Sequence, residues 1–402
     1  GYSNFLTETR DALRIAGGAV VILSAISGVK VQTEKIWEFA DEFEVCRIAF
    51  VNKMDRDRAS FFRAVDDMER VLKVRGIPVQ IPIGEGAGFT GVVVLVEMKA
   101  YEYKMDGSGA SASGPVPEAL AKDAAKVRED MVAAIAETDE ALTEKYLGGE
   151  EVTAAELKKA IREGVLTRRF IPVYAGSALK NIGVDRLMEA INLALPSPAD
   201  KGAIRGEVRG VNPDTGAEVV RSPDPKGPFS AFVFKTLIDP FTGKLSIFRI
   251  YSGTLTTETP VINSSTGARE KISHIYLLEG RKVKEVASAT AGDIAAVAKL
   301  KDVVTGSTLS DPADPVVFAP FPPVNATLSF AIHQVTKGDE DKVPSAMAKL
   351  MEEDPALDFR RDENTNEFLL SGVGQVHLEV SIEKLKRKYG CEVELKAPRI
   401  PY

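Results

Sequence analysis

Strand-like apolar runs alternate with helical patterns through the first 200 residues of the chain. The runs lie at Ala19–Leu23, Arg47–Val51 and Phe170–Tyr174, and amphipathic segments at Thr33–Phe43 and Val184–Leu195 have helical spacing. An apolar run without polar alternation is typical of a parallel strand that is covered on both faces. The alternation therefore predicts a doubly wound α/β domain.

Two further segments belong to this first part of the chain. A strand is predicted over Ile77–Ile83, and a helix-rich stretch follows from Glu118 to Arg168. Asp106–Gly114 consists of Asp, Gly, Ser and Ala, a composition typical of a mobile loop tip.

The pattern changes at Pro196–Asp200. From there to Pro228 the chain is rich in Gly, Pro, Asp and Arg without periodicity, which is typical of a linker or a long surface connection. From Phe229 onward short strands follow one another closely, with turn sequences between them. Closely spaced strands without intervening helices predict a small β-barrel or sandwich.

A Pro-rich boundary at Asp311–Pro323 precedes the last pattern. A strand, a helix from about Asp341 to Glu353, two strands, a helix over Gln375–Tyr389 and a final strand are predicted in that order. The order β-α-β-β-α-β predicts a ferredoxin-like split βαβ sandwich.

Composition excludes several classes of protein. The 402 residues include 51 Lys and Arg against 58 Asp and Glu, a net charge of −7, with 44% hydrophobic and 27% charged residues. These values are ordinary for globular domains and argue against disorder, collagen and a membrane bundle. The longest apolar stretch, Ala16–Val29, is interrupted and too short to cross a bilayer, so no membrane partner is expected. Cys46 and Cys391 lie far apart, which favours a reducing, cytoplasmic location.

The N-terminus has neither an initiator Met nor a basic leader region. We therefore expect the chain to be a piece of a longer protein.

The segment Asn52-Lys53-Met54-Asp55 directly follows the strand Arg47–Val51. Open α/β sheets bind their ligands at the carboxyl ends of the strands. A carboxylate there can accept from both the ring N–H and the exocyclic amine of guanine, a Lys stem can cover the base, and an Asn amide can join neighbouring loops. The segment therefore suggests guanine binding by Asn52, Lys53 and Asp55. The alternative is a polar turn that caps the next helix.

A second segment, Gly176-Ser177-Ala178-Leu179-Lys180, directly follows the last parallel strand. A tight turn with a small residue at Ala178 can bring a backbone N–H close to the guanine carbonyl oxygen. An ordinary strand-to-helix turn is the alternative, but the presence of both segments at strand ends favours a nucleotide site.

The chain resembles the translational GTPases, and within them elongation factor G. Asn52–Asp55 is similar to the family's guanine-specificity motif, and Ser177-Ala178-Leu179 to its second guanine loop. Collinear similarities extend over the rest of the chain, at Gly18–Glu34, Asp239–Lys244, Arg249–Gly253, Ala291–Ala295, Leu300–Gly306, Glu352–Pro355 and Ser371–Glu379.

The resemblance implies a domain division. Residues 1–200 would be a partial GTPase domain of the phosphate-loop type, truncated at its N-terminus, with an insert subdomain at about 84–170. Residues 201–316 would be a connector and the translation-factor β-barrel known as domain II, 321–397 the ferredoxin-like domain III, and 398–402 the start of a next domain.

The resemblance also implies ligands and partners. The full-length protein would bind GTP or GDP with Mg²⁺, and would contact ribosomal RNA and proteins through domains II and III as a monomer. It would couple GTP hydrolysis to the translocation of tRNA and mRNA. However, the sequence contains no G-x-x-x-x-G-K-[ST] phosphate loop and none of the family's Mg²⁺ ligands, so the chain alone is not expected to hydrolyse GTP.

One residue departs from the family pattern. Gly1 aligns with the Gly of the second switch, and Tyr2 then stands where the family has a histidine that helps to place the attacking water. A phenol, with an ordinary pKa near 10, is a poor proton acceptor at neutral pH, although its hydroxyl can orient a water. The alternative to a translocase is therefore a GTP-gated ribosome-binding paralogue, acting in recycling, protection or regulation with slow or dispensable hydrolysis.

The three histidines show no metal-ligand spacing with the two cysteines, and we predict no metal ligand among them. His274 and His333 are expected to be hydrogen-bonded structural residues, and His377 to pack at a helix start. Lys384, Lys386, Arg387 and Lys388 form either a solvated helix end or a contact to ribosomal RNA.

Overall fold

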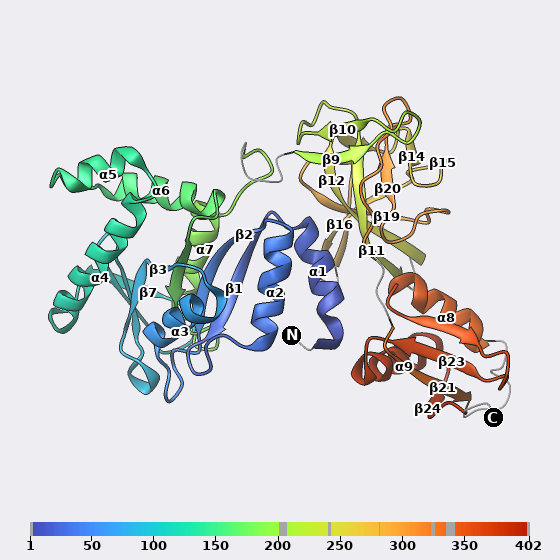
Figure 1. The fold of residues 1–402 in the computed structure, drawn as a ribbon, viewed down its shortest axis with the longest axis horizontal. Helices are drawn as coiled ribbons and strands as arrows, with labels where there is room; N and C mark the ends of the chain where they lie inside the picture. The colour runs from blue at the N-terminus through green and yellow to red at the C-terminus, as the bar shows by residue number, and fades with distance from the viewer. Residues whose placement is uncertain are drawn as a thin grey trace. The chain divides into compact units, whose positions relative to one another are not determined.

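A computed structural model of the chain describes residues 3–200, 207–239, 243–280, 282–322, 326–334 and 342–399 (Figure 1). Its elements form two compact units. One unit contains the elements from β1 to α7, and the other contains η1, α1 and the elements from β9 to β24. In the described residues no helix has the length and apolar character that a bilayer crossing needs.

A four-stranded parallel sheet forms the centre of the first unit. Its order is β1 (Gly18–Ser24), β2 (Cys46–Asn52), β8 (Ile171–Ala175) and β3 (Gly76–Pro78). Six of the seven residues of β2 are buried, as its apolar run predicts.

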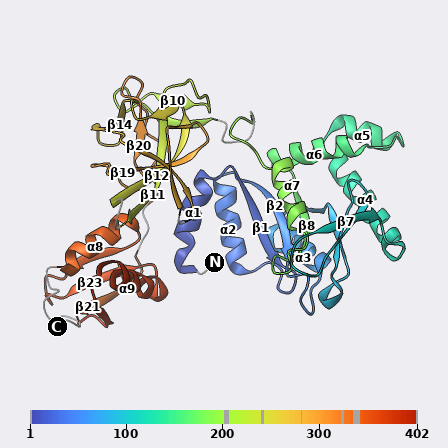
Figure 2. The same cartoon turned by 180° about the vertical axis from the view of Figure 1, so that it is seen from behind.

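Helices cover both faces of this sheet (Figure 2). Ile48 and Phe50 of β2 pack in the core with α6 (Ala154–Leu166) and α7 (Val184–Ala194). The alternate residues of β2 pack on the other face with α2 (Val31–Glu42) and α3 (Phe61–Asp67), which continues into a π-helical turn, η2 (Met68–Leu72). The predicted doubly wound α/β domain is confirmed.

The predicted strand over Ile77–Ile83 was wrong, because the segment divides between two sheets. It contributes β3 to the parallel sheet and β4 (Gln80–Ile83) to an antiparallel sheet. Val79 lies at the division, where its N–H donates to the Val173 carbonyl at 3.1 Å and its carbonyl accepts from the Leu95 N–H at 3.0 Å. Periodicity along one chain could not reveal this change of partner.

The antiparallel sheet continues from β4 through β5 (Gly91–Val94) and β6 (Lys99–Tyr103) to β7 (Ser111–Pro115). Part of the segment expected to be a mobile loop tip is therefore strand, because residues 111–114 belong to β7. These residues are held in a strand by their pairing with β6, which their Gly and Ser content does not indicate.

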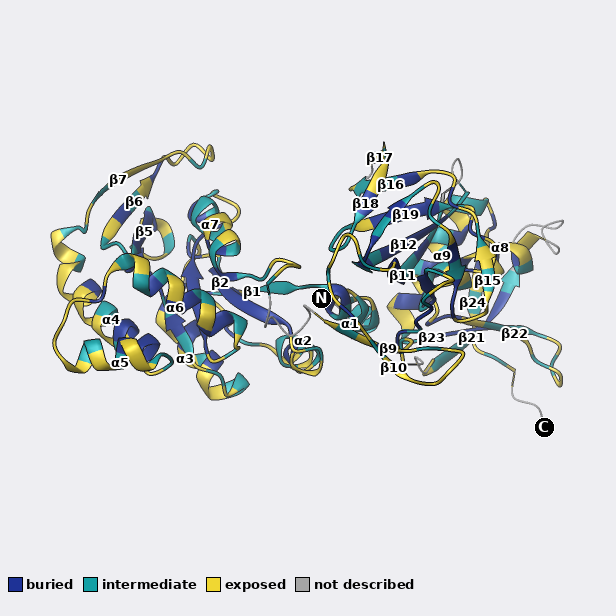
Figure 3. Ribbon diagram, turned by 90° about the horizontal axis from the view of Figure 1, so that it is seen from above, coloured by how far each residue is buried: buried dark blue, intermediate teal, exposed yellow. Residues whose placement is uncertain are grey.

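Three helices follow the antiparallel sheet along the chain, namely α4 (Glu118–Ala136), α5 (Glu140–Leu147) and α6. Helices α4 and α5 each have one buried and one exposed face (Figure 3). Thr153 caps α6, since its hydroxyl accepts from the Glu156 N–H while the Glu156 carboxylate accepts from the Thr153 N–H at 2.8 Å.

The second unit contains the β-rich domain. Its eight-stranded sheet has the order β15-β14-β20-β11-β12-β19-β16-β17, and β13 pairs separately with β18. The bounds are β11 (Ser230–Asp239), β12 (Gly243–Ser252), β13 (Thr254–Thr256), β14 (Val261–Asn263), β15 (Ala268–Glu270), β16 (Ile275–Glu279), β17 (Lys282–Val286), β18 (Ser288–Thr290), β19 (Ile294–Ala298) and β20 (Thr308–Ser310). The predicted β-rich domain is confirmed.

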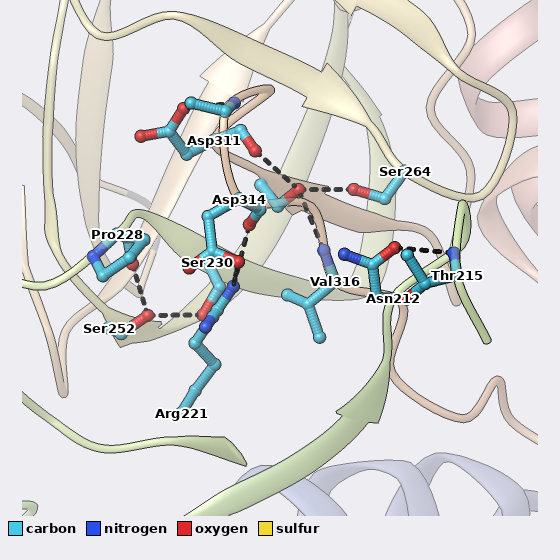
Figure 4. Close-up of polar contacts among 12 residues, drawn as sticks. Asn212, Thr215, Arg221, Pro228, Ser230, Ser252, Ser264, Asp311, Asp314 and Val316 are labelled. Carbon is cyan, nitrogen blue, oxygen red and sulfur yellow. Dashed lines mark hydrogen bonds and ion pairs between the residues drawn. The ribbon is translucent and has the colours of Figure 1, made fainter. Parts of the chain in front are cut away.

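The segment expected to be an irregular connector contains a hairpin, β9 (Val208–Val211) with β10 (Glu218–Arg221). Arg221 is 7% exposed and donates to the Asp314 backbone oxygen at 2.8 Å, with the Asp314 carboxylate 2.9 Å away (Figure 4). Beside it Ser230 and Ser252 share a hydrogen bond of 2.7 Å inside the strands. The charged contact therefore fixes the hairpin to the β-rich domain, which local composition does not indicate.

The last domain has the predicted split βαβ order. Its strands are β21 (Leu328–Gln334), β22 (Asp358–Arg361), β23 (Phe368–Gly372) and β24 (Val393–Lys396), in the sheet order β22-β23-β21-β24. Helices α8 (Lys342–Glu353) and α9 (Gln375–Tyr389) pack together with this sheet in one core. The ferredoxin-like prediction is confirmed.

His377, expected to pack at the start of a helix, is buried and also hydrogen-bonded. Its Nε2 lies 2.8 Å from the Asp354 carboxylate, and its Nδ1 accepts from the Val373 N–H at 3.2 Å. The Phe5 ring of η1 (Ser3–Phe5) contacts the imidazole edge-on at 6.1 Å between centroids. Helix α1 (Leu6–Ile15) then packs Ile15 against Phe232 of β11.

Gly164 of α6 offers a test of the packing of the first unit. A Cβ at this position would lie 2.1 Å from the Phe170 ring, which is buried beneath the helix. Gly164→Ala should therefore destabilise this unit by about 1–2 kcal/mol, despite the better helix propensity of Ala. Urea unfolding measures the change in the free energy of unfolding.

Gly114→Ala is the control, because a Cβ at Gly114 would have no atom within 4 Å. This substitution should change stability by less than about 0.5 kcal/mol. Equal effects of the two substitutions would contradict the packing described.

Candidate functional site

Two loops leave the parallel sheet at the same edge. Strands β2 and β8 pair in parallel, with Val51 opposite Ala175, so Asn52 and Gly176 both lie at carboxyl ends of strands. The Gly176 N–H donates to the Val51 carbonyl at 3.0 Å, and the Met54 N–H donates to the Gly176 carbonyl at 3.2 Å. The backbones of the two loops are thus joined directly.

Asn52 adds a side-chain connection between the loops. Its Oδ1 accepts from the Ala178 N–H at 2.9 Å and from the Lys53 N–H at 2.7 Å. Lys53 has a φ of 67°, a left-handed conformation that is uncommon for a residue with a side chain. The Asn52 amide oxygen therefore also stabilises the turn that displays Lys53.

Ser177 and Asp55 form the third connection. The fully buried Ser177 hydroxyl donates to Asp55 Oδ1 at 2.6 Å and accepts from the Lys180 N–H at 3.2 Å. The Asp55 side chain keeps 10% of its surface exposed, and Arg56 Nε lies 3.9 Å from its other oxygen. The carboxylate is therefore oriented by Ser177 while it remains accessible from the pocket.

Gly176 is required by the close approach of the loop to the core. A Cβ there would lie 2.5 Å from both the Ile182 carbonyl oxygen and the Phe50 ring. Backbone hydrogen bonds of 3.0 Å in both directions between Ser177 and Ile182 then close the loop.

A pocket of about 330 Å³ lies between these loops. Its lining includes the predicted residues Asn52, Lys53, Asp55, Ser177 and Leu179. Ala178 is not in the lining, but its backbone N–H holds Asn52.

Sequence reasoning missed two residues of the pocket, Ile26 and Arg56. Arg56 follows the predicted segment directly and could have been included. Ile26 follows β1, and only the pairing of β1 with β2 brings it to the pocket. Ile26 and Leu179 are 40% and 71% exposed, so the pocket carries apolar surface that a flat ligand can cover.

Tyr2, the predicted catalytic position, lies outside the described residues. Within the ranges that the structure describes, no three His, Cys, Asp or Glu side chains converge on a possible cation position.

The antiparallel sheet is joined to the loop that follows β8 and to helix α7. The Tyr103 hydroxyl of β6 donates to Asp185 Oδ1 at 2.5 Å, near the start of α7. The pKa of Tyr103 is raised above its ordinary value, mainly because the side chain is buried and secondly because of this hydrogen bond to Asp185. Arg186 stacks over Tyr101 at 4.3 Å, and Asn181 Nδ2 donates to the Gly107 carbonyl at 3.3 Å. The loop is therefore supported from the insert as well as from β2.

Family models match three parts of the chain. The elongation factor Tu GTP-binding domain matches residues 1–197, elongation factor G domain 2 matches residues 228–311, and elongation factor G domain III matches residues 322–397.

Whole proteins match along the entire chain. Elongation factor G of Thermotoga petrophila and that of Thermotoga maritima are each 40% identical over all 402 residues. The chain spans 57% and 58% of the length of these two curated relatives. A crystal structure of a protein from Thermus thermophilus superposes with a TM-score of 0.83 at 34% identity, covering 100% of this chain and 56% of that one.

Tyr103→Phe tests the connection between the insert and α7. It removes one hydrogen bond to a carboxylate and keeps the ring, so the first unit should lose about 1–2 kcal/mol of stability in urea unfolding. Tyr101→Phe is the matched control, because its hydroxyl lies 3.4 Å from Glu97 and should contribute less than about 0.5 kcal/mol. An unchanged stability of Tyr103→Phe would show that the connection is energetically neutral.

Proposed function

This chain belongs to the elongation factor G family of translational GTPases, and we propose that the pocket between its β2 and β8 loops binds the guanine base of GTP or GDP. The observation that carries the proposal is the position of Asp55, whose carboxylate faces the pocket and is held by Ser177 at 2.6 Å. A carboxylate in this position accepts from two adjacent N–H groups of guanine, which adenine does not present together.

The other residues of the pocket have complementary roles in this proposal. The aliphatic part of Lys53 covers one face of the base, and exposed Leu179 and Ile26 supply apolar contact. Asn52 holds the two loops together through the Ala178 N–H. The guanine carbonyl oxygen accepts from a backbone N–H of the Ser177–Leu179 loop.

Hydrolysis requires parts beyond this pocket. We propose that the full-length protein supplies a phosphate loop and Mg²⁺ ligands, and that this chain alone does not hydrolyse GTP. Strand β1 is compatible with an additional neighbour, since it lies at the edge of the parallel sheet with Ile22 61% exposed. We assign no Mg²⁺ ligand among the described residues.

We further propose that the full-length protein couples GTP hydrolysis to tRNA and mRNA translocation on the ribosome. In this proposal it acts as a cytoplasmic monomer and contacts the ribosome through domain II (201–316) and domain III (321–397). Residues 1–200 would form part of the GTPase domain, with the insert at about 84–170.

Tyr2 favours a second candidate function. A phenol is a poor general base at neutral pH, so a GTP-gated ribosome ligand with slow hydrolysis is the alternative to a translocase. This alternative keeps the guanine pocket unchanged and differs only in turnover.

Asp55→Asn in the full-length protein tests the pocket. The amide presents one donor and one acceptor in place of two acceptors, so GTP affinity should fall by about 10- to 100-fold, and xanthine nucleotides, which present an acceptor there, should bind relatively better. Equilibrium titration with fluorescent nucleotides measures both affinities, and Asp57→Asn, outside the pocket lining, is the matched control. Unchanged GTP affinity in Asp55→Asn would place the base elsewhere.

Tyr2→His in the full-length protein separates the two candidate functions. If Tyr2 limits hydrolysis, the histidine should raise ribosome-stimulated GTP turnover by about 10-fold or more, because a positioned general base contributes on this scale. Multiple-turnover phosphate release measures the rate, with Tyr2→Phe as the control for the hydroxyl. The slow-hydrolysis alternative would be excluded if the wild type hydrolysed GTP rapidly and Tyr2→His had the same turnover rate.

A further inference from the structure

A second cavity, of about 440 Å³, lies between strands β4, β5 and β8 on one side and helices α6 and α7 on the other. It shares no lining residue with the pocket of about 330 Å³. Its lining comes from the β3–β4 segment, the end of β5 and the following turn, β8, α6 and α7. The whole cavity therefore lies within the first unit.

Two buried polar groups line this cavity with hydrogen-bonding capacity unused by the described residues. Tyr174 of β8 is 6% exposed, and no described residue hydrogen-bonds its hydroxyl. Gln80 of β4 is 2% exposed; its Oε1 accepts from the Ala175 N–H at 3.4 Å, while its amide nitrogen has no partner among the described residues.

These two groups present hydrogen-bond donors to the cavity. Burial raises the pKa of the Tyr174 hydroxyl, so it stays protonated, and the Gln80 amide nitrogen can only donate. Neither atom is among the fully buried side-chain atoms that lack a partner in the described part of the chain, so both are open to the cavity. The oxygen of a ligand in the cavity can therefore accept from both.

The charges at the cavity are already paired within the protein. Lys158 bonds to Glu97 at 2.6 Å, while Arg186 pairs with Glu189 at 2.8 Å and with Asp185 at 3.1 Å. Both cations and all three carboxylates are therefore engaged within the protein. The cavity therefore favours an uncharged ligand.

The remaining walls are mostly aliphatic. Val79, Val94 and Val96 lie on the strand side, and Ile161, Ala190 and Leu193 lie on the helix side. A cavity of this size with apolar walls and a few placed polar groups is typical of small-molecule sites.

We propose that this cavity binds an uncharged organic molecule with a compact apolar body and a carbonyl-type oxygen, which accepts from Tyr174 and Gln80. The site is independent of the guanine pocket and of the proposed GTPase activity. It touches β8 and α7, the two elements that flank the loop from Gly176 to Gly183.

Benzamide serves as the probe, since it combines a small apolar ring with a neutral carbonyl group. Methyl NMR of the 402-residue chain should show shifts at Val94 and Ile161 and a dissociation constant of about 1 mM, as expected for so small a ligand. Benzoate and benzylamine, of similar size but charged, should each bind at least about five-fold more weakly.

Tyr174→Phe keeps the ring and removes the donor, so benzamide should bind about three- to ten-fold more weakly to it. Tyr146→Phe in α5, outside the lining, should bind benzamide like the wild type. The methyl spectra of both variants also report whether the fold is preserved. Three results would overturn the proposal: no shift at these methyl groups up to about 20 mM benzamide, equal binding of the charged analogues, or unchanged affinity in a folded Tyr174→Phe.

Discussion

The hydrogen bond between Ser177 and Asp55 joins two loops that are 122 residues apart in the sequence, and the proposed guanine site depends on it. A lone carboxylate at the end of a strand would rotate freely. Here one oxygen is fixed by a fully buried hydroxyl that the Lys180 N–H holds in turn. The Asn52 side chain also joins the two loops, because its amide oxygen accepts a hydrogen bond from the Ala178 N–H. Because the protein itself holds these groups in place, binding of a base in the proposed site would cost little reorganisation.

The parallel sheet explains why so much of this site could be predicted from the sequence. An apolar run followed by polar residues locates the carboxyl end of a strand, and parallel strands bring such ends together. Asn52, Asp55 and Ser177 were expected at one edge of the sheet on this ground, and the structure brings them together. Ile26 was not, because its place depends on which strands are neighbours. The roles of all these residues, and of Tyr2, stay predictions.

The fold shows the same limit. The three domain types could be predicted, since strand and helix periodicities follow local burial. The division of residues 76–83 between two sheets could not, because Val79 bonds to Val173 on one side and Leu95 on the other. The hairpin β9–β10 was missed for a similar reason. Its Arg221 forms an ion pair with Asp314, which lies far from the hairpin in the sequence. Contacts through Tyr103 and Asn181 likewise connect the insert to the loop after β8.

The most direct test of the guanine site is the selectivity of the full-length wild-type protein among three diphosphates. Isothermal titration calorimetry should give the tightest dissociation constant for GDP. Inosine diphosphate lacks only the exocyclic amine, so it loses one hydrogen bond to a carboxylate and should bind about 10- to 100-fold more weakly. ADP should show no measurable binding. Equal affinity for GDP and inosine diphosphate would contradict the role assigned to Asp55.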